Sequence, residues 1–248
     1  MIKDFEYIIK KIFIPEKYLL KKRLIRSLKN NYEKELSIID RFSNKSKIAI
    51  DVGVYRGVYT YKFSKLFKKV ISFEPNPLIY KYLSKNLNKL LNNIEIYNYA
   101  LSDKSGTATL KIPNRKKSFF NQNYEEIYKL GAATIHKKNK LEKFDSFEVK
   151  TKKLDDVIEN NHIGFIKIDV EGHEMEVIKG SIELIKKNKP TLLIEIEEKH
   201  TQKPVEQTIN YIKGLGYECY QLKNQDIIKF KLSDHKKEDN NFIFLADK

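Results

Sequence analysis

The sequence predicts an α/β fold: a Rossmann-like, largely parallel sheet with helices on both faces, preceded by a helical segment. From Ile48 onward, short runs rich in Val, Ile and Leu alternate with helix-like runs, and parallel strands buried on both faces have this composition. Several of these runs end in an acidic or polar residue. The chain has 248 residues, of which 41% are hydrophobic, enough for one large domain with its own core.

The first 45 residues are expected to be helical. The runs with apolar residues at helical spacing cover 5–14, 16–30 and 33–42. Pro15 separates the first two runs, because proline is poorly tolerated inside a helix. We therefore expect an N-terminal helical segment over 1–45 and the main domain over 46–248.

The main domain begins where the pattern changes to alternating strands and helices. Five expected core strands lie in "KIAIDV", "KVISFEP", "IEIYNYAL", "FIKIDVEG" and "TLLIEIEE". The expected helices cover about 57–68, 77–91, 173–187 and 204–214. Two further strands, "GTATLKI" and "SFEVKTKKL", flank a polar insert over about 113–146, and "YECYQL" and "NFIFLA" close the chain.

The first strand-to-helix turn is the leading candidate for a ligand site, because ligands of such sheets bind beyond the carboxyl ends of the strands. "DVGVYRG" places Asp51, Gly53 and Gly57 there, and Glu74 ends the next strand. An acid at that place accepts hydrogen bonds from ribose hydroxyls. The G-x-G-x-x-G turn that seats a pyrophosphate is absent, which disfavours a dehydrogenase. S-adenosylmethionine has a ribose and no diphosphate, and Asp51 would orient its cationic methionine end.

Ser102 and Asp103 follow the third strand, where an adenine would lie in this geometry. A carboxylate or a backbone amide there can bind the adenine edge. The sequence "SDKSG" is equally good turn chemistry, so both interpretations stay open.

The stretch "IKIDVEGHEMEVIKG" brings Asp169, Glu171 and His173 to the end of the fourth strand, and Glu195 ends the fifth. Adjacent strand ends would place Asp169 and Glu195 in one site. Carboxylates side by side can act as a general base or hold a hard cation. Asp169 and Glu171 are candidates for cofactor or acceptor contact, with His173 or Glu195 as alternative bases. Acids at a helix N-terminus are also favourable without any catalytic role.

In this order, "DVGVYRG", "FEPNP", "ALSDKSG", "LDDVI" and "IKIDVEGHEMEVIKG" resemble the FkbM-type S-adenosylmethionine-dependent methyltransferases over about 48–200. The resemblance implies a seven-stranded methyltransferase sheet and O-methylation of a hydroxyl, often on a sugar. The cofactor contacts it implies are Asp51, Gly53, Tyr55, Gly57, Glu74, Asn76, Ser102, Asp103 and Asp169. One departure is in the first motif, where Val54 and Tyr55 replace the Ala and Asn usual in the family.

The remaining composition bears on partners and location. The net charge is +15, but only five of the 48 basic residues are Arg, the side chain that nucleic-acid readers use for bidentate contacts. An RNA 2′-O-methyltransferase is the weaker alternative, because such an enzyme would want a Lys at the end of the fifth strand, where Glu195 and Glu197 stand. A non-catalytic S-adenosylmethionine-binding module is a third. Cys219 is the only cysteine and no signal peptide is visible, which predicts a cytoplasmic protein. A divalent metal is possible but is not expected, because no H-x-H or H-x-x-x-H spacing occurs.

The acceptor site is expected over the strand ends, built from segments outside the core. The insert over about 113–146 carries Phe119, Phe120, Tyr124 and Tyr128 among Asn and Lys residues. Aromatic faces with amide and ammonium donors suit a small-molecule or glycan acceptor with many hydroxyls. A solvated loop has a similar composition. The segment 1–45 could instead form a homodimer interface or a peripheral contact with a membrane.

Overall fold

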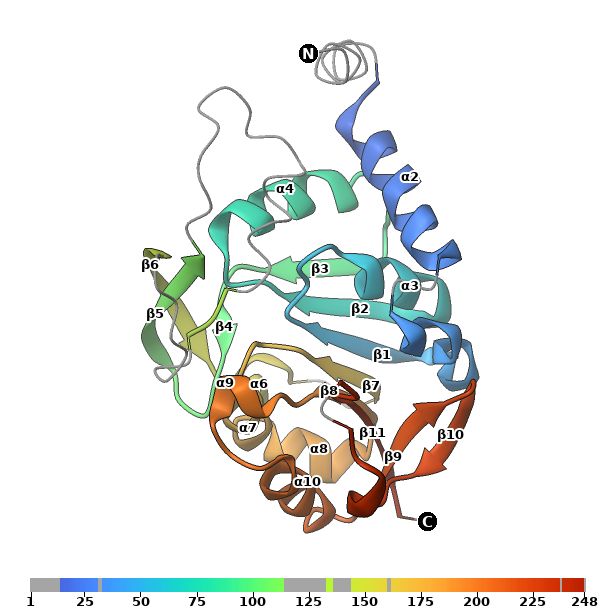
Figure 1. The fold of residues 1–248 in the computed structure, drawn as a ribbon. Coiled ribbons are helices and arrows are strands. Elements are labelled where there is room, and N and C mark those ends of the chain that lie inside the picture. The colour runs from blue at the N-terminus through green and yellow to red at the C-terminus, as the bar shows by residue number, and fades with distance from the viewer. Residues whose placement is uncertain are drawn as a thin grey trace.

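A computed structural model describes residues 14–30, 33–113, 133–135, 144–159, 162–236 and 238–247. Its main feature is an eight-stranded sheet with the order β10-β9-β11-β8-β7-β1-β2-β3 (Figure 1). The strands are β1 (Asn44–Val52), β2 (Phe67–Phe73), β3 (Ile94–Tyr97), β7 (Ile163–Ile168), β8 (Thr191–Glu195), β9 (Tyr217–Lys223), β10 (Asp226–Lys229) and β11 (Asn241–Ala246). The five strands from β8 to β3 are parallel, and β11, β9 and β10 pair antiparallel.

The predicted fold class is confirmed, with one strand more than the seven expected. The extra strand is β10, which forms a hairpin with β9 across Asn224 and Gln225. Both turn residues have positive φ, as two-residue hairpin turns require. No apolar run marks β10, because an edge strand buries little of its surface.

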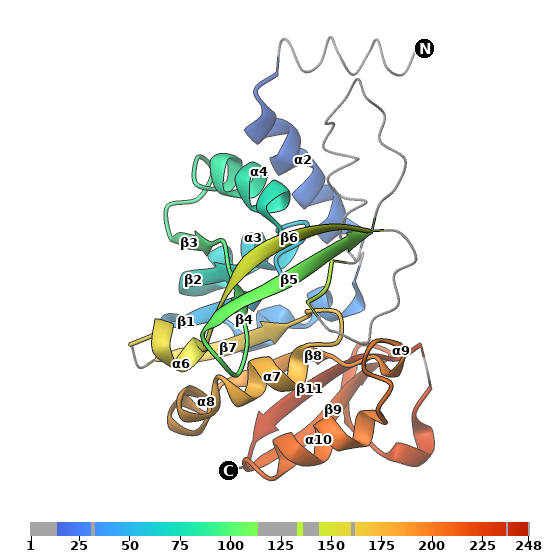
Figure 2. The ribbon, with the colours of Figure 1, turned by 90° about the vertical axis from the view of Figure 1, so that its left-hand side faces the viewer.

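A second sheet with the order β4-β6-β5 lies beyond the carboxyl ends of β1, β2 and β3 (Figures 1 and 2). Its strands are β4 (Ala100–Leu101), β5 (Gly106–Pro113) and β6 (Phe144–Lys152). The expected strand "IEIYNYAL" is therefore two strands in different sheets, since the chain leaves the main sheet after Tyr97. This small sheet forms a wall over the strand ends.

Helices cover both faces of the main sheet, as predicted. One face carries α2 (Glu16–Lys29), α3 (Val58–Leu66) and α4 (Pro77–Leu87), and the other carries α6 (Leu154–Val157), α7 (Glu174–Lys179), α8 (Ile182–Asn188) and α10 (Val205–Lys213). Successive side chains of β1 point to opposite faces of the sheet. Ile50 and Val52 pack in the apolar cluster that includes α7 and α8, whereas Ala49 packs in the cluster that includes α3. A helix was expected over 173–187, but the structure breaks it at Gly180. A Cβ there would lie 2.0 Å from the carbonyl oxygen of Ser102.

The N-terminal segment packs on the α3 and α4 face. Leu20 and Leu24 of α2 are fully buried in the same apolar cluster as Phe63 and Leu83. The expected helix over 33–42 forms as two short 3₁₀ helices, η1 (Lys34–Ser37) and η2 (Ile39–Phe42). The expected helix over 5–14 lies almost wholly outside the described residues. The division at residue 45 remains a prediction.

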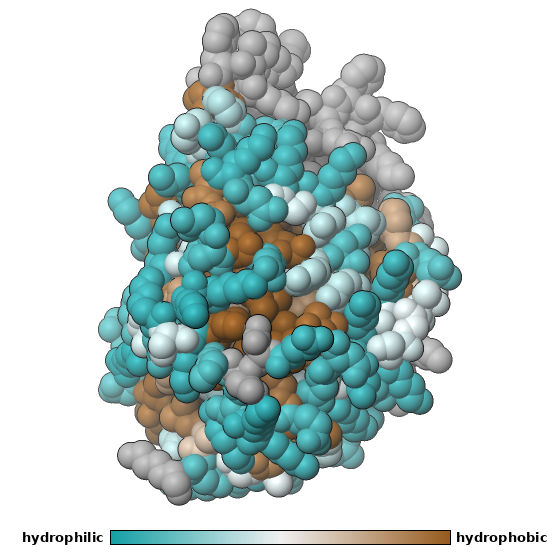
Figure 3. Space-filling model, turned by 180° about the vertical axis from the view of Figure 1, so that it is seen from behind, coloured by the Kyte–Doolittle hydropathy of each residue, from teal (hydrophilic) through white to brown (hydrophobic). Residues whose placement is uncertain are grey.

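The face of the molecule opposite to that seen in Figure 1 is largely polar. From behind, hydrophilic side chains surround a smaller central area of apolar ones (Figure 3). Among the described residues, no helix has the length and apolar character needed to cross a membrane. The remaining short helices are α9 (Glu198–Thr201), treated below with the site, and η4 (Leu232–Asp234).

Candidate active site

A pocket of about 520 Å³ opens at the carboxyl ends of β1, β2, β7 and β8, against β4 and β5 of the second sheet. This volume is in the range of small-molecule sites. The side chains and turns on its wall come from Glu33, Val52, Gly53, Tyr55, Arg56, Phe73, Glu74, Pro75, Ile79, Tyr99, Ala100, Leu101, Leu110, Ala133, Ile135, Asp169, Val170, Glu171, His173, Glu195 and Asn241. Seven of the twelve predicted site residues are therefore on the wall.

The first turn is shaped by glycine where the sequence predicted it. Gly53 has φ +84°, and a Cβ there would lie 1.8 Å from the carbonyl oxygen of Asp169. The turns after β1 and β7 therefore approach each other as closely as backbones can. Gly57 has φ +75° and stands at the N-cap of α3, away from the pocket wall.

Glu74 is fixed by backbone donors. Its Oε2 accepts from the Tyr55 N–H at 2.9 Å, and its Oε1 accepts from the Asn76 N–H at 2.9 Å. The side chain is 5% exposed, and burial raises its pKa to about 7 although these two donors oppose the rise. A carboxylate has about four acceptor positions, so two remain for a ligand in the pocket. Asn76 itself is fully buried, caps α4 through the Leu78 N–H, and is not on the pocket wall.

Asp51 lies under the pocket, in a buried polar row across three strands. Strand register places Ser72 on one side of it and Lys167 on the other. Its Oδ2 accepts from the Thr60 hydroxyl at 2.6 Å. Burial raises the pKa of Asp51 to about 6, although Lys167 opposes the rise. The predicted contact between Asp51 and a cofactor stays a prediction, because its carboxylate is fully buried and does not reach the wall.

Aromatic side chains form the wall next to Glu74. Phe73 and Tyr99 have ring centroids 5.5 Å apart, and Tyr97 stacks on Phe73 at 5.7 Å. Burial raises the pKa of Tyr99 to about 12, so its hydroxyl stays protonated. With Leu101, the rings of Phe73 and Tyr99 make this part of the wall apolar.

Ser102 and His173 are brought together beside this wall. The Ser102 hydroxyl and the His173 Nε2 are 2.9 Å apart, and Ser102 also donates to Asp103 at 3.2 Å. His173 stands at the N-cap position of α7 and lines the pocket, whereas Ser102 and Asp103 do not line it. The two interpretations of "SDKSG" therefore both remain open.

Asp169 is held by a buried cation. Lys167 Nζ donates to Asp169 Oδ2 at 3.0 Å and to the Gly53 carbonyl at 3.2 Å. Burial lowers the pKa of Lys167, but Asp169 and Asp51 more than reverse this, so the pKa is raised. Burial, and then the neighbouring Asp169, raise the pKa of Glu195. The fourth and fifth strands thus bring their acids into one site, as predicted.

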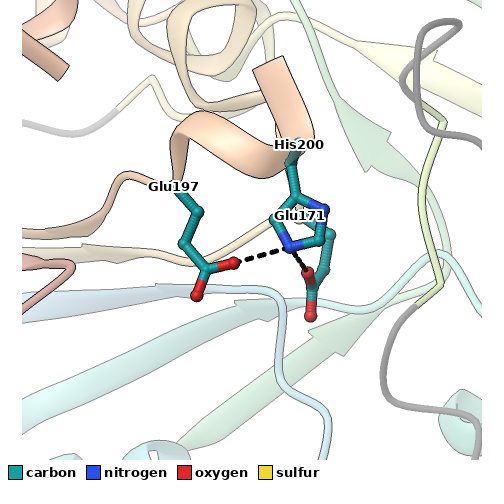
Figure 4. Close-up of side chains that lie close together, drawn as sticks. All are labelled: Glu171, Glu197 and His200. Atoms are coloured by element: carbon teal, nitrogen blue, oxygen red, sulfur yellow. Dashed lines mark ion pairs between the residues drawn. The ribbon is translucent and has the colours of Figure 1, made fainter. Parts of the chain in front are cut away.

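Glu171 belongs to a second cluster at the pocket edge (Figure 4). Its Oε2 is 2.8 Å from His200 Nε2, which is also 2.7 Å from Glu197 Oε2. Burial lowers the pKa of His200, but Glu171 and Glu197 more than compensate, so the pKa is raised. His200 was not predicted, although Glu197-x-x-His200 at a helix start is a spacing that brings both side chains to one face.

Glu33 and Arg56 are further wall residues that sequence reasoning missed. Glu33 lies between α2 and η1, and burial raises its pKa although nearby Lys167 opposes the rise. No local pattern marks Glu33, because it reaches the pocket only through the packing of the N-terminal segment. Arg56 lies in the first turn, and a basic residue in a turn expected to bind a ligand is the feature that could have identified it as a site residue.

The insert contributes two described residues to the wall, Ala133 and Ile135. Thr134 pairs with Lys111 of β5 through two backbone hydrogen bonds of 2.9 and 3.0 Å, which sets Ala133 and Ile135 against the pocket. The Thr134 hydroxyl donates to the Glu171 carbonyl at 2.9 Å. Phe119, Phe120, Tyr124 and Tyr128 lie outside the described residues.

The pocket lies at the strand ends of a Rossmann-like sheet, with an acid fixed after the second strand, which is where sheets of this class bind nucleotide cofactors. Residues 51–219 match the model of the methyltransferase FkbM domain. The chain therefore belongs to the FkbM methyltransferase domain family.

Named relatives agree with this assignment. The chain is 28% identical over 152 residues to the methyltransferase sdnD of Sordaria araneosa, covering 53% of this chain and 59% of the relative. It is 29% identical over 114 residues to the hexuronic acid methyltransferase AglP of Haloferax volcanii, covering 45% and 40%. The matches thus span about half the length of these relatives.

A solved structure shows the same fold. The methyltransferase FkbM from Methylobacillus flagellatus KT aligns with a TM-score of 0.52 and 16% identity, covering 81% of this chain and 44% of that one. At this level of identity the likeness concerns the fold alone.

Proposed function

We propose that the chain is an S-adenosylmethionine-dependent O-methyltransferase that acts on a hydroxyl of a sugar. The observation that carries the proposal is Glu74, a buried carboxylate that two backbone N–H groups orient at the pocket wall. A carboxylate fixed in this way is suited to accept both ribose hydroxyls of a nucleoside.

The other groups of the pocket fit the same cofactor. Tyr99 and Leu101 offer an apolar surface for an adenine. The methionine part would lie beside the turn after β1, where Gly53 is on the pocket wall. Each of these contacts is part of the proposal, as are those of Tyr55, Ser102 and Asp103.

The acceptor would lie on the side of β7 and β8. S-adenosylmethionine supplies an activated methyl group on a sulfonium, and methyl transfer to an oxygen releases the thioether and one proton. Asp169 would hold the acceptor hydroxyl and take that proton, because its side chain is on the pocket wall and Lys167 fixes one of its carboxylate oxygens. In-line positioning and proton removal are the two tasks left to the protein.

A sugar acceptor is supported by two separate observations. One named relative is a hexuronic acid methyltransferase. In this chain, acids, His173 and Arg56 surround the pocket, and such polar groups bind hydroxyl-rich rings. Arg56 is in addition a suitable partner for an acceptor carboxylate.

The test is transfer of labelled methyl groups from S-adenosylmethionine to separate acceptor pools of neutral glycans, uronic-acid glycans and RNA. We expect label in a glycan pool as an alkali-stable ether, which excludes a methyl ester. Label confined to RNA would overturn the sugar acceptor and favour the 2′-O-methyltransferase alternative. Cofactor binding with no labelled pool would favour the non-catalytic binding module.

A further inference from the structure

We propose a site for one divalent transition-metal ion at Glu171, Glu197 and His200, the triad drawn in Figure 4. Its three ligand atoms come from the turn after β7, the residue before α9 and α9 itself. All three lie within 4.8 Å of one another. One imidazole nitrogen and two carboxylate oxygens suit Zn²⁺ or Mn²⁺.

The distances between the donors are close to those of a bound ion. His200 Nε2 is 2.8 Å from Glu171 Oε2 and 2.7 Å from Glu197 Oε2. Ligands bound at about 2.1 Å to one metal lie about 3.0 Å apart at octahedral angles and about 3.4 Å apart at tetrahedral angles. Small outward movements of the two carboxylates would therefore admit the ion.

The charges of the triad also suit a cation. A single Nε2–H is one donor, and it faces two carboxylate oxygens at once. A metal ion at the centre would interact with both carboxylates at once. The exposed ammonium of Lys199 contacts Glu197 Oε2, and it would have to give way to the ion.

Neighbouring side chains and backbone hold the side chains of the triad in place. Asn240 donates to Glu197 Oε1 at 2.6 Å, which fixes the carboxylate from behind. Hydrogen bonds of this kind orient metal ligands. Glu171 has φ +54°, and Gly172 packs so closely on His200 that a Cβ there would lie 2.9 Å from the His200 Cβ.

The triad stands where an ion could act on the acceptor. Glu171 lines the main pocket together with Asp169 and Glu195, and Glu197 lines a second cavity of about 600 Å³. Three protein ligands leave positions open, as in catalytic rather than structural metal sites. An acceptor hydroxyl or carboxylate could take one of them. This role rests on the proposed function, whereas metal binding itself does not.

The test is titration of the metal-stripped full chain with Mn²⁺, followed by electron paramagnetic resonance, with Zn²⁺ as competitor. Glu197→Gln is compared with Glu198→Gln, the same change one residue along in a side chain outside the triad, and His200→Ala is a second triad variant. Thermal melts establish that each variant is folded. We expect one Mn²⁺ per parent chain, displaced by Zn²⁺, and at least about tenfold weaker binding in both triad variants only.

Three results would overturn the inference. They are no Mn²⁺ binding by the parent at millimolar concentration, equal weakening in Glu198→Gln, and undiminished binding in folded triad variants. S-adenosylhomocysteine affinity is measured in EDTA on the same preparations. If the parent binds S-adenosylhomocysteine but not Mn²⁺, only the metal site is overturned. If the parent does not bind S-adenosylhomocysteine, the proposed function is overturned, whatever the result for Mn²⁺.

Discussion

The two halves of the strand-end edge hold their acids in different ways. At the ends of β1 and β2, Asp51 and Glu74 accept hydrogen bonds from neutral donors of the chain, the Thr60 hydroxyl and two backbone N–H groups. After β7 and β8, the acids face one another and side-chain cations. Asp169 is paired with Lys167, and His200 lies between two glutamates.

This difference separates two tasks. Donors from the backbone cannot move without refolding the turn, so Glu74 is suited to bind one ligand in one place. Carboxylates that share cations can exchange a partner for a substrate, a proton or a metal ion, so the β7 and β8 half is suited to chemistry. The account therefore assigns cofactor binding to the first half and the acceptor to the second.

The largest expected effect is on turnover in Asp169→Asn. Loss of a positioned base typically lowers the rate by about 10²–10⁴-fold, and we expect kcat to fall in that range while the affinity for S-adenosylhomocysteine changes little. Initial rates and calorimetry measure the two quantities. Asp156→Asn, an exposed acid beside Lys153, is the matched control. Equal losses of rate and melting temperature would show that Asp169 acts mainly in folding.

The second expected effect is a free energy of unfolding that falls as the pH rises, because of the acids at the ends of β1 and β2. The folded-state pKa of Glu74 is raised from 4.5 to about 7, so the folded chain binds its proton more tightly than the unfolded chain does. The resulting stabilisation is present below pH 4.5 and is lost as the pH rises toward 7. Asp51, with a pKa raised to about 6, acts in the same direction.

The measurement is the free energy of unfolding by urea between pH 4.5 and 8, in the parent and in Glu74→Gln. We expect the parent to lose up to about 3 kcal/mol relative to the variant over this interval. If the difference in unfolding free energy between the parent and Glu74→Gln does not change with pH, the pKa of Glu74 is not raised by folding. Such a result would remove the contrast between the two halves.

The smallest expected effect concerns the insert. Thr134→Val removes the hydroxyl that holds the Glu171 carbonyl, a hydrogen bond worth about 1 kcal/mol. We expect the acceptor KM to rise about fivefold, with unchanged cofactor affinity. Thr107→Val, at an exposed position of β5, is the control. If Thr134→Val changes the affinity for the cofactor and not the acceptor KM, residues 133–135 belong to the cofactor part of the site.

The strands and the acids at their ends were predictable from sequence, because burial on both faces leaves unbroken apolar runs. Gly53 was predictable for a similar reason, since a tight turn at a strand end restricts the residue type. Glu33 was not, because its position depends on how a distant segment packs. The strand after Tyr97 was misread as continuous, since nothing local marks the place where a chain changes sheets.

His200 shows a different limit. Its side chain meets Glu197 within one helical turn, which a search for Glu-x-x-His would have found, but it meets Glu171 only because β7 and β8 are neighbours. Spacing along the chain therefore indicates the contact of His200 with Glu197 but not its contact with Glu171. The catalytic roles of Asp169, Glu171, His173 and Glu195 remain predictions, because proximity alone does not assign chemistry.

The most direct test of the division between the two halves is calorimetric titration of S-adenosylhomocysteine into the parent, Glu74→Gln and Asp169→Asn. Glu95→Gln, a surface acid of β3 paired with Lys69, is the control. The account predicts one site in the parent, binding weakened about tenfold or more in Glu74→Gln through loss of a charge-assisted hydrogen bond, and near-parental binding in Asp169→Asn. No binding by the parent, or parental binding in Glu74→Gln, would contradict it.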